Sequence, residues 1–240
     1  MFASLAVAVA LSQIAQPAQT ALKIEDVKLG TGEGVKNYDL VEAYCTGTLT
    51  NGKEFYSNVK SGKPLLFQIG VGKVIKGWDL GFIGLKLNGE RNLTIPPDLG
   101  YGTHAMGDDI PANSTLKFFV KLVKVYPSSK VTIVTEGKGD SIKLNQFLIC
   151  KLSLKSSLGK ELSDPTREAR LQLSKEMWPW VNQAVGGIKV GEKRKVVVPS
   201  EIAYGKAGKP AKDENGKKAG SDVPPNSDLT MEIEALKFVE

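Results

Sequence analysis

The chain of 240 residues has little of what most enzymes use for catalysis. It contains one histidine, His104, and two cysteines, Cys45 and Cys150, which lie far apart in the sequence. This pattern lacks the spacing of a metal site, so we expect no metal and no other cofactor. We also find no glycine-rich phosphate loop, no nucleophile elbow and no Ser/His/Asp set. An enzyme with this sequence would work without ordinary acid–base or nucleophilic groups.

One apolar run stands out at residues 2–14, and no charged residue precedes Lys23. The run is too short to cross a membrane and has the length of a signal-peptide core. We therefore expect residues 1–22 to be a signal peptide and the mature protein to be periplasmic or extracellular. No Lys or Arg precedes the run and no clean cleavage site follows it, so a truncated start or a short buried helix is the alternative. No later segment is apolar for long enough to span a bilayer, so we expect no stable membrane insertion.

Charge is balanced along the chain rather than concentrated in one region. The sequence has 32 Lys and Arg against 26 Asp and Glu, a net charge of +6, and the basic residues are scattered among acidic ones. A nucleic-acid footprint would gather them on one face with aromatic residues, so we expect no nucleic-acid partner. The two cysteines lie in apolar, strand-like runs, one in each half. This favours two buried free thiols, and an interdomain disulfide is the alternative.

The most informative pattern is a stretch of nineteen residues that occurs twice, at 84–102 and 187–205, with a constant offset of 103. Six positions are identical and six more are conservative exchanges. A period near one hundred is too long for a solenoid, whose repeats run roughly 20–50 residues. The sequence therefore predicts one small domain used twice, at 23–126 and 131–240, with a linker at 127–130.

Each half has the pattern of several antiparallel strands around one short helix, which predicts the α+β fold class. In the first half, strands are expected at 38–50, 53–56, 65–69, 91–95 and 115–125, with a helix at 78–85 and a tight turn at Asn51-Gly52. In the second half, strands are expected at 146–154, 193–198 and 229–236, with a helix near 181–188. Residues 206–225, rich in Lys, Gly and Asp, are expected to form an exposed loop.

Several separated motifs of the first half resemble the FKBP-type peptidyl-prolyl isomerase domain. They are VIKGW at 74–78, GLKLNGER at 84–91, IPP at 95–97, YG at 101–102 and IP at 110–111. The resemblance covers about residues 23–126 in the family's order and almost without gaps. It implies an antiparallel sheet curled around a short helix in each domain, and rotation of X-Pro peptide bonds as the activity.

The resemblance also implies an apolar aromatic pocket. Trp78 would form its floor beneath the proline ring, Tyr101 would hold a substrate carbonyl, and the backbone of Val74 and Ile75 would meet the peptide. The implied catalytic residues are Trp78, Tyr101, Phe118, Phe55 and Ile75, and the implied substrate-binding residues are Val74, Leu65, Phe67, Ile110, Tyr56 and Cys45. Without the resemblance, these strand aromatics would be assigned to core packing, and Phe67 fits either role.

The first half departs from the family pattern at three of these positions. Cys45 stands where a Tyr is usual, Tyr56 stands where an Asp follows the Phe, and Leu65 replaces a frequent aromatic. The pocket therefore lacks one carboxylate and one phenol while gaining another phenol. Because the floor and most apolar walls are kept, we expect reduced but measurable isomerase activity.

The second half keeps the framework residues and loses most of the pocket. Val181 takes the place of Trp78, with Trp178 and Trp180 beside it, and Tyr204 keeps the place of Tyr101. Leu162, Ser163 and Met231 replace the other pocket residues Phe55, Tyr56 and Phe118. We interpret this half as a degenerate domain that binds or scaffolds. The alternative is that Trp178 rebuilds a floor from a shifted register.

Two functions of different classes follow from these observations. The first is an exported peptidyl-prolyl isomerase and folding helper, whose partners are proline-containing peptides or unfolded chains and, as inhibitors, macrolide FKBP ligands. The second is a non-catalytic peptide-binding chaperone or assembly protein that grips hydrophobic segments. Trp78, Tyr101 and Phe118 favour the first function, whereas Cys45 and Tyr56 favour the second.

Overall fold

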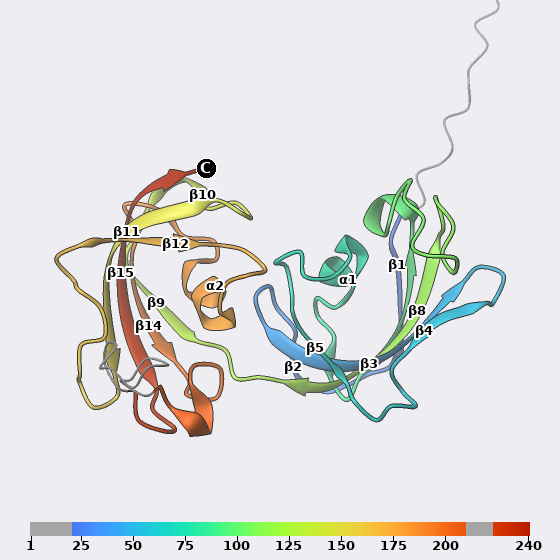
Figure 1. Ribbon diagram of the computed structural model, residues 1–240, viewed down its shortest axis with the longest axis horizontal. Helices are drawn as coiled ribbons and strands as arrows, with labels where there is room; N and C mark the ends of the chain where they lie inside the picture. The colour runs from blue at the N-terminus through green and yellow to red at the C-terminus, as the bar shows by residue number, and fades with distance from the viewer. Residues whose placement is uncertain (1–20, 210–222) are drawn as a thin grey trace, which may run out of the picture.

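The computed structural model describes residues 21–209 and 223–240 (Figure 1). The expected signal peptide, apart from Ala21 and Leu22, lies outside these residues, and so does most of the loop expected at 206–225. Within the described ranges, no helix has the length and apolar character needed to cross a bilayer.

The first half is a strongly curved antiparallel sheet with a short helix on its concave side (Figure 1). Six strands form this sheet in the order β1-β7-β8-β3-β4, and β5 also pairs with β3, while β2 and β6 form a separate pair. The elements are β1 (Lys23–Lys28), β2 (Thr31–Gly34), β3 (Leu40–Leu49), β4 (Glu54–Ser57), β5 (Leu65–Gln68), α1 (Lys76–Gly81), β6 (Lys86–Leu87), β7 (Glu90–Ile95), the 3-10 turn η1 (Pro97–Leu99) and β8 (Leu116–Val125).

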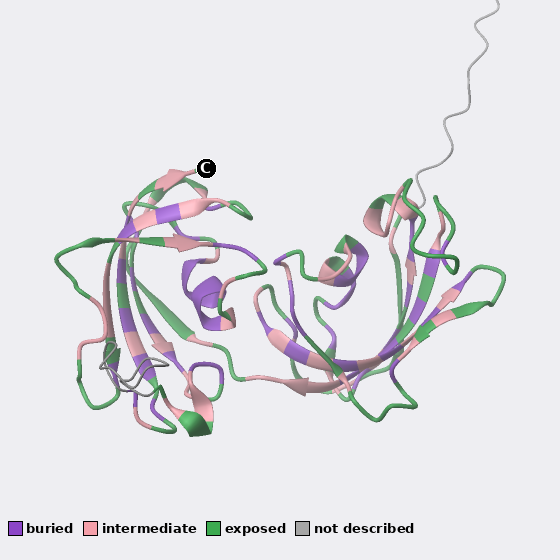
Figure 2. Cartoon of the chain, viewed as in Figure 1, coloured by how far each residue is buried: buried purple, intermediate pink, exposed green. Residues whose placement is uncertain are grey.

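The alternating pattern of the long strands places their apolar side chains on the concave side. In β8, Leu116, Phe118, Val120 and Leu122 are all buried, as the two-residue period predicts. Helix α1 packs closely on β7, because a Cβ at Gly77 would overlap the Ile95 side chain. Figure 2 shows buried residues along α1 and the central strands, so the core lies between the helix and the sheet.

The second half repeats this architecture around its own core. Five strands form its main sheet in the order β12-β11-β15-β14-β9, and β10 pairs with β13. The elements are β9 (Lys130–Thr135), β10 (Lys138–Ser141), β11 (Phe147–Ser156), β12 (Glu168–Gln172), α2 (Pro179–Val185), β13 (Lys189–Val190), β14 (Lys193–Val198), η2 (Gly205–Ala207) and β15 (Leu229–Val239). The predicted α+β class, with an antiparallel sheet curled around a short helix in each half, is confirmed.

Strands β3 and β11 each contain one shift in pairing register, and aligning these shifts shows which residues of the two halves correspond. The pairing shifts between Glu42 and Ala43 in β3 and between Ile149 and Cys150 in β11. Cys150 therefore corresponds to Ala43, so Cys45 and Cys150 do not occupy equivalent places in the two halves. Both cysteines are buried free thiols, as expected.

One buried arginine in each half ties the end of the helix to the sheet. Arg91 Nη1 donates to the carbonyl oxygens of Gly81 and Ile83, at 2.6 and 3.0 Å. Arg194 Nη1 donates in the same way to Ala184 and Gly186, at 2.9 and 2.8 Å. These carbonyls lie in or just after the last helical turn and have no partner within the helix, so the guanidinium satisfies them. The arginine shared by the two copies is therefore part of the framework.

Several elements differ from the sequence expectations. Helix α1 spans Lys76–Gly81 instead of the expected 78–85, and Ile83, beyond its end, is exposed. At the Asn51-Gly52 turn, Gly52 alone has a positive φ. Lys130, expected in the linker, is the first residue of β9. Strands β1, β2, β9, β10 and β12 were not expected, because none of their residues is buried and they show no clear alternation.

The buried cysteines give a first prediction about reactivity. Burial raises the pKa of the Cys45 and Cys150 thiols to about 12, so at pH 8 only about one thiol in ten thousand is ionised. We expect neither thiol to react with Ellman's reagent in the native protein and both to react in denaturant. Because the fold favours the neutral thiol, the associated stability is complete below pH about 9 and decreases between about 9 and 12. Rapid labelling of native protein at pH 8 would contradict this burial.

Candidate functional site

Side chains from distant parts of the first half surround an open cavity of about 620 Å³. The lining comes from β4, the start of β5, the segment before α1, the helix itself, the loops after η1 and strand β8. The lining residues are Phe55, Tyr56, Leu65, Gly72, Lys73, Val74, Ile75, Trp78, Tyr101, Met106, Ile110 and Phe118. A cavity of this size and mainly apolar character can hold a short peptide segment or a small ligand.

The structure brings nine of the eleven predicted site residues together in this lining: Phe55, Tyr56, Leu65, Val74, Ile75, Trp78, Tyr101, Ile110 and Phe118. Two predicted residues are absent from it. Phe67 is buried in the core with its ring centroid 5.3 Å from that of Trp78. Cys45 is also fully buried, and its backbone amide donates to the side chain of Asn58 at 2.8 Å. Phe67 and Cys45 therefore support the cavity wall from the core.

The floor of the cavity is held by a cluster of interlocked aromatic rings. Trp78 is only 3% exposed. Its ring lies edge-to-face with Phe118, at a centroid distance of 5.1 Å, and Phe118 meets Phe55 in the same way at 5.5 Å. From the core, Phe82 contacts Trp78 at 5.4 Å. Edge-to-face contacts of this kind fix the rings relative to one another, so the cavity is preformed rather than collapsible.

Few polar groups face this apolar lining. Within the described residues, the hydroxyl of Tyr101 and the backbone amide of Ile75 make no hydrogen bond, so both are free to bind a ligand. Burial raises the pKa of Tyr56, and the neighbouring Cys45 thiol raises this pKa further, so Tyr56 is a neutral phenol at physiological pH. The arrangement can hold a peptide by its carbonyl and amide groups while enclosing an apolar ring.

The segment between β5 and α1 forms one rim of the cavity and is tied to the helix. Gly70 and Gly72 both have positive φ angles, which glycine adopts without strain. Their backbone amides donate to the two carboxylate oxygens of Asp79, at 2.8 and 3.2 Å. Burial raises the pKa of Asp79, although these two hydrogen bonds lower it in part. The carboxylate thus fixes the rim that carries Val74 and Ile75.

Three lining residues, Gly72, Lys73 and Met106, are not among the residues that the sequence predicts for the site. Gly72 and Lys73 directly precede the motif that begins at Val74, so extending the motif by two residues would have included them. Met106 lies in a loop, where it forms an isolated bridge with Ile110. No local pattern marks Met106, because its position depends on the loop folding back toward the helix.

In the second half, an exchange of large and small residues on the helix removes the equivalent floor. The helices α1 and α2 follow Ile75 and Trp178 as their N-caps, so Gly77-Trp78 corresponds to Trp180-Val181. Trp180 and Val181 are both buried in the second core. Moving the indole by one position turns it to another side of the helix. The ring that would form a floor therefore fills core space instead.

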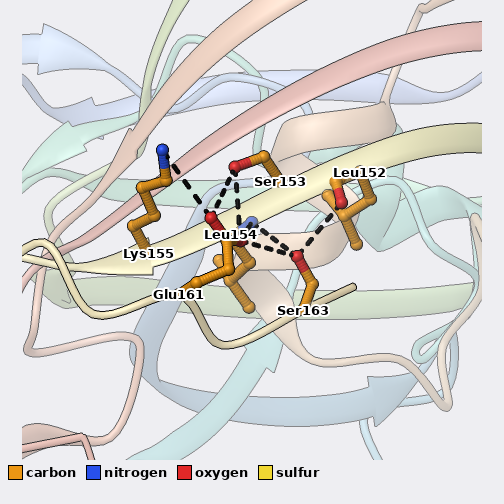
Figure 3. A network of polar contacts seen from close by, with 6 residues as sticks. All are labelled: Leu152, Ser153, Leu154, Lys155, Glu161 and Ser163. Atoms are coloured by element: carbon orange, nitrogen blue, oxygen red, sulfur yellow. Dashed lines mark hydrogen bonds and ion pairs between the residues drawn. The ribbon is translucent and has the colours of Figure 1, made fainter. Parts of the chain in front are cut away.

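A polar network stands where the second half would need an apolar rim (Figure 3). Ser163, which replaces Tyr56, donates to the carbonyl of Leu152 at 3.0 Å and accepts from the amide of Leu154 at 2.8 Å. Glu161 accepts from Ser153 at 3.2 Å and lies 3.6 Å from the ammonium of Lys155. Burial raises the pKa of Glu161, but hydrogen bonds from Ser163, Leu154 and Ser153 outweigh this and lower it. The network therefore pairs the polar side chains of Glu161 and Ser163 with strand β11 itself.

Trp178 does not rebuild a floor in the second half. Its side chain is 54% exposed, and its ring packs against Tyr204 at a centroid distance of 5.8 Å. The ammonium of Lys209 lies 5.7 Å from the centroid of the same tyrosine ring. Tyr204, the tyrosine that both copies share, is thus covered by an aromatic ring and a cation.

Comparison with known proteins places these observations in a family. The model of the FKBP-type peptidyl-prolyl cis-trans isomerase family matches residues 32–123 and 139–236. An FK506-binding protein of Neisseria meningitidis serogroup B is 50% identical over 106 residues, which cover 44% of this chain and 96% of the relative. An FK506-binding protein 4 of Chaetomium thermophilum is 54% identical over 102 residues, which cover 42% of this chain and 21% of the relative.

The chain thus spans about a fifth of the length of this fungal relative and nearly all of the Neisseria relative. Among solved structures, FkpA from Escherichia coli is similar at 40% identity and a TM-score of 0.42, covering 47% of this chain and 51% of that one. Because the family model matches well over half of the residues, in two successive regions, this chain is a member of the FKBP-type peptidyl-prolyl cis-trans isomerase family with two FKBP-like domains.

Proposed function

We propose that this chain is a peptidyl-prolyl cis-trans isomerase and folding helper whose first domain, residues 23–126, rotates X-Pro bonds. The observation that carries the proposal is the open apolar cavity above Trp78, in which nine residues implied by the family resemblance converge. Family membership supports the same activity. The second domain, which begins with β9 at Lys130 and follows a linker at 127–129, is proposed to lack this activity.

The chemistry requires no titrating side chain. An X-Pro bond rotates by losing amide resonance, against a barrier of roughly 18–20 kcal/mol. The twisted amide is less polar than the planar amide, so a dry apolar cavity favours the transition state over the ground state. Each reduction of the barrier by about 1.4 kcal/mol gives a tenfold rate increase. The scarcity of histidine and cysteine in this chain is consistent with such a mechanism.

Each proposed role follows from a residue's place in the cavity. Trp78 supports the proline ring from below, and the free hydroxyl of Tyr101 donates to a substrate carbonyl. The backbone of Val74 and Ile75 binds the peptide, and Phe55, Ile110 and Phe118 form the walls, with Leu65 and Tyr56 also in the lining. Phe67 and Cys45 contribute by supporting these residues from the core. Because Tyr56 stands where the family usually has an acid, we propose reduced rather than full activity.

The proposed partners are proline-containing segments of unfolded or partly folded chains, with macrolide FKBP ligands as inhibitors. The apolar lining supports this choice, since Lys73 is the one charged side chain among the lining residues that the structure describes. We further propose that residues 1–22 direct export to a periplasmic or extracellular location. N-terminal mass determination of the mature protein tests this, and retention of residues 1–22 would contradict it.

A prolyl-peptide isomerisation assay with the full chain tests the proposed function. We expect catalysis above the uncatalysed rate, and we expect a macrolide FKBP ligand to abolish it, because both occupants need the same apolar cavity. A rate equal to background at micromolar protein would contradict the proposal. The macrolide arm distinguishes this cavity from any contaminating isomerase of another family, which the macrolide would leave active.

A second function, non-catalytic peptide binding, is favoured by one observation. The second half presents an exposed Trp178 packed on Tyr204, an apolar surface without a preformed floor. A chaperone that grips hydrophobic segments would suppress aggregation of an unfolded client that contains no proline. Protection of such a client, unaffected by the macrolide and unaccompanied by isomerisation, would favour this function over catalysis.

A further inference from the structure

We propose that Asn182 and Gln183 of the second domain act as positioning residues for the cavity of the first domain. This inference rests on the proposed function of that cavity. It assigns a role to a domain that has lost its own cavity floor. The role is to hold strand β5, and the rim segment that follows it, in the geometry described above.

The centre of the contact between the halves is a buried and fully paired amide network. Asn182 is 0% exposed, and its Nδ2 donates to Oε1 of Gln68 at 2.7 Å and to the carbonyl of Ser174 at 2.8 Å. Gln68 Nε2 in turn donates to the carbonyls of Tyr38 and Pro179, at 2.8 and 2.9 Å. A buried amide that loses its partner is costly, whereas a completed network specifies one arrangement. The two halves are therefore held in a defined orientation.

A second amide strengthens the same contact next to the linker. Gln183 Nε2 donates to the carbonyl of Tyr38 at 3.1 Å. Its Oε1 accepts from the backbone amide and the hydroxyl of Ser129, both at 2.8 Å. Gln183 thus fixes the linker and the first half at once, so the linker does not act as a free hinge.

Apolar packing surrounds these amides. Tyr38, Leu40 and Tyr126 of the first half all pack against the core of the second half. A Cβ added at Gly186 would overlap the Tyr38 ring, so this glycine allows the close approach. The backbone of Gly186 has φ −53° and ψ 126°, which any residue adopts. In the first half the equivalent residue is Ile83, whose carbonyl accepts from Arg91 as that of Gly186 accepts from Arg194. The shared fold therefore tolerates a side chain at this position.

The contact leads directly to the cavity. Gln68 is the residue after Phe67, whose ring contacts that of Trp78. The rim segment begins two residues later at Gly70 and reaches the lining at Gly72. A methyl group added at Gly72 would lie 3.4 Å from Cδ2 of Leu144 in the second half, so the side chain of Leu144 lies next to the rim. The β5-to-rim segment is therefore hydrogen-bonded to the second domain at Gln68 and lies near it again at Gly72.

The variant Gly186→Ala in the full chain tests this inference, because the added methyl group would overlap the Tyr38 ring and is expected to push the halves apart. It changes neither a cavity residue nor a backbone amide of the network. We expect a larger radius of gyration in X-ray scattering. We also expect the amides of Gly70 and Gly72 to exchange with deuterium about tenfold faster. kcat/KM for a prolyl peptide should fall by about three- to tenfold, a typical coupling between distant sites.

The matched control is the double variant Gly186→Ala with Tyr38→Gly. It removes the ring that the new methyl group meets, and glycine suits the positive φ of Tyr38. We expect it to restore slow exchange at Gly70 and Gly72 in part, which a general loss of stability would not do. If Gly186→Ala does not fold, Gln183→Ala provides the same test with a smaller effect.

Unchanged exchange at Gly70 and Gly72 in a variant whose halves have separated would overturn the inference. Unchanged kcat/KM in such a variant would overturn it as well. If the wild-type chain has no isomerase activity, the proposed function fails, but the exchange measurement still decides whether the second domain holds the rim.

Discussion

Replacing Trp78 with alanine is expected to lower kcat/KM for prolyl-peptide isomerisation by about a hundredfold, equivalent to about 2.7 kcal/mol of transition-state stabilisation. The physical reason is that Trp78 forms the floor of the cavity and is only 3% exposed. Its removal opens the apolar enclosure to water and removes the surface proposed to support the proline ring. Stopped-flow assays of the full chain provide the measurement.

Two controls separate catalysis from folding in this experiment. Removing a buried Trp side chain costs about 3–5 kcal/mol of stability, so the variant must be assayed well below its own unfolding temperature. The matched variant Trp178→Ala removes an exposed indole from the second half, and we expect it to leave kcat/KM unchanged. The opposite pattern, with activity lost in Trp178→Ala and kept in Trp78→Ala, would mean that the second domain is the catalyst.

Replacing Arg194 with alanine is expected to destabilise the protein by about 3–5 kcal/mol, the usual cost of breaking a buried ion pair. Arg194 Nε donates to Glu192, whose side chain is only 3% exposed, and Nη1 satisfies the carbonyls of Ala184 and Gly186. Within the described part of the chain, alanine leaves the buried Glu192 carboxylate without its cation, with only the amide of Lys189 as a donor, and leaves two carbonyls without a donor. Urea unfolding followed by fluorescence measures the loss.

The first half contains the matched variant, Arg91→Ala. Arg91 makes the same two carbonyl contacts, but its acidic partner Asp26 has a side chain that is 39% exposed and can be solvated by water. We therefore expect a smaller loss, by about 1–2 kcal/mol, than for Arg194→Ala. Equal losses would show that the carbonyl contacts alone account for the effect. Lys195→Ala, at an exposed neighbouring position, should change stability by less than about 0.5 kcal/mol.

The buried strands of the fold were largely predictable from local sequence patterns, whereas its exposed edge strands were not. The alternation in β8 and the strand at Lys193–Val198 follow from a period of two with one buried face. Strand β1 has no buried position, because it lies at the edge of the sheet and pairs with β7 alone. Without a buried face, an edge strand leaves no periodic signal in the sequence.

Most of the candidate site was predictable because the family resemblance spans the motifs that supply its lining. Cys45 and Phe67 were expected at the site but lie in the core, since a position in a motif does not tell which face of a strand a side chain occupies. The partnership of Gln68 with Asn182 could not be predicted. The two residues are 114 positions apart and meet only when both domains have folded and docked.

The exchange of Gly77-Trp78 for Trp180-Val181 has an evolutionary consequence. Val181→Trp alone would place a second indole beside the buried Trp180, and overpacking of this kind costs about 1–3 kcal/mol. Trp180→Gly alone would leave a large hole, at about 3–5 kcal/mol or more. Each single step toward an indole at position 181 with a small residue before it therefore lowers the stability of the second domain. The second copy therefore keeps its fold in a sequence from which an aromatic floor cannot be regained by one favourable substitution.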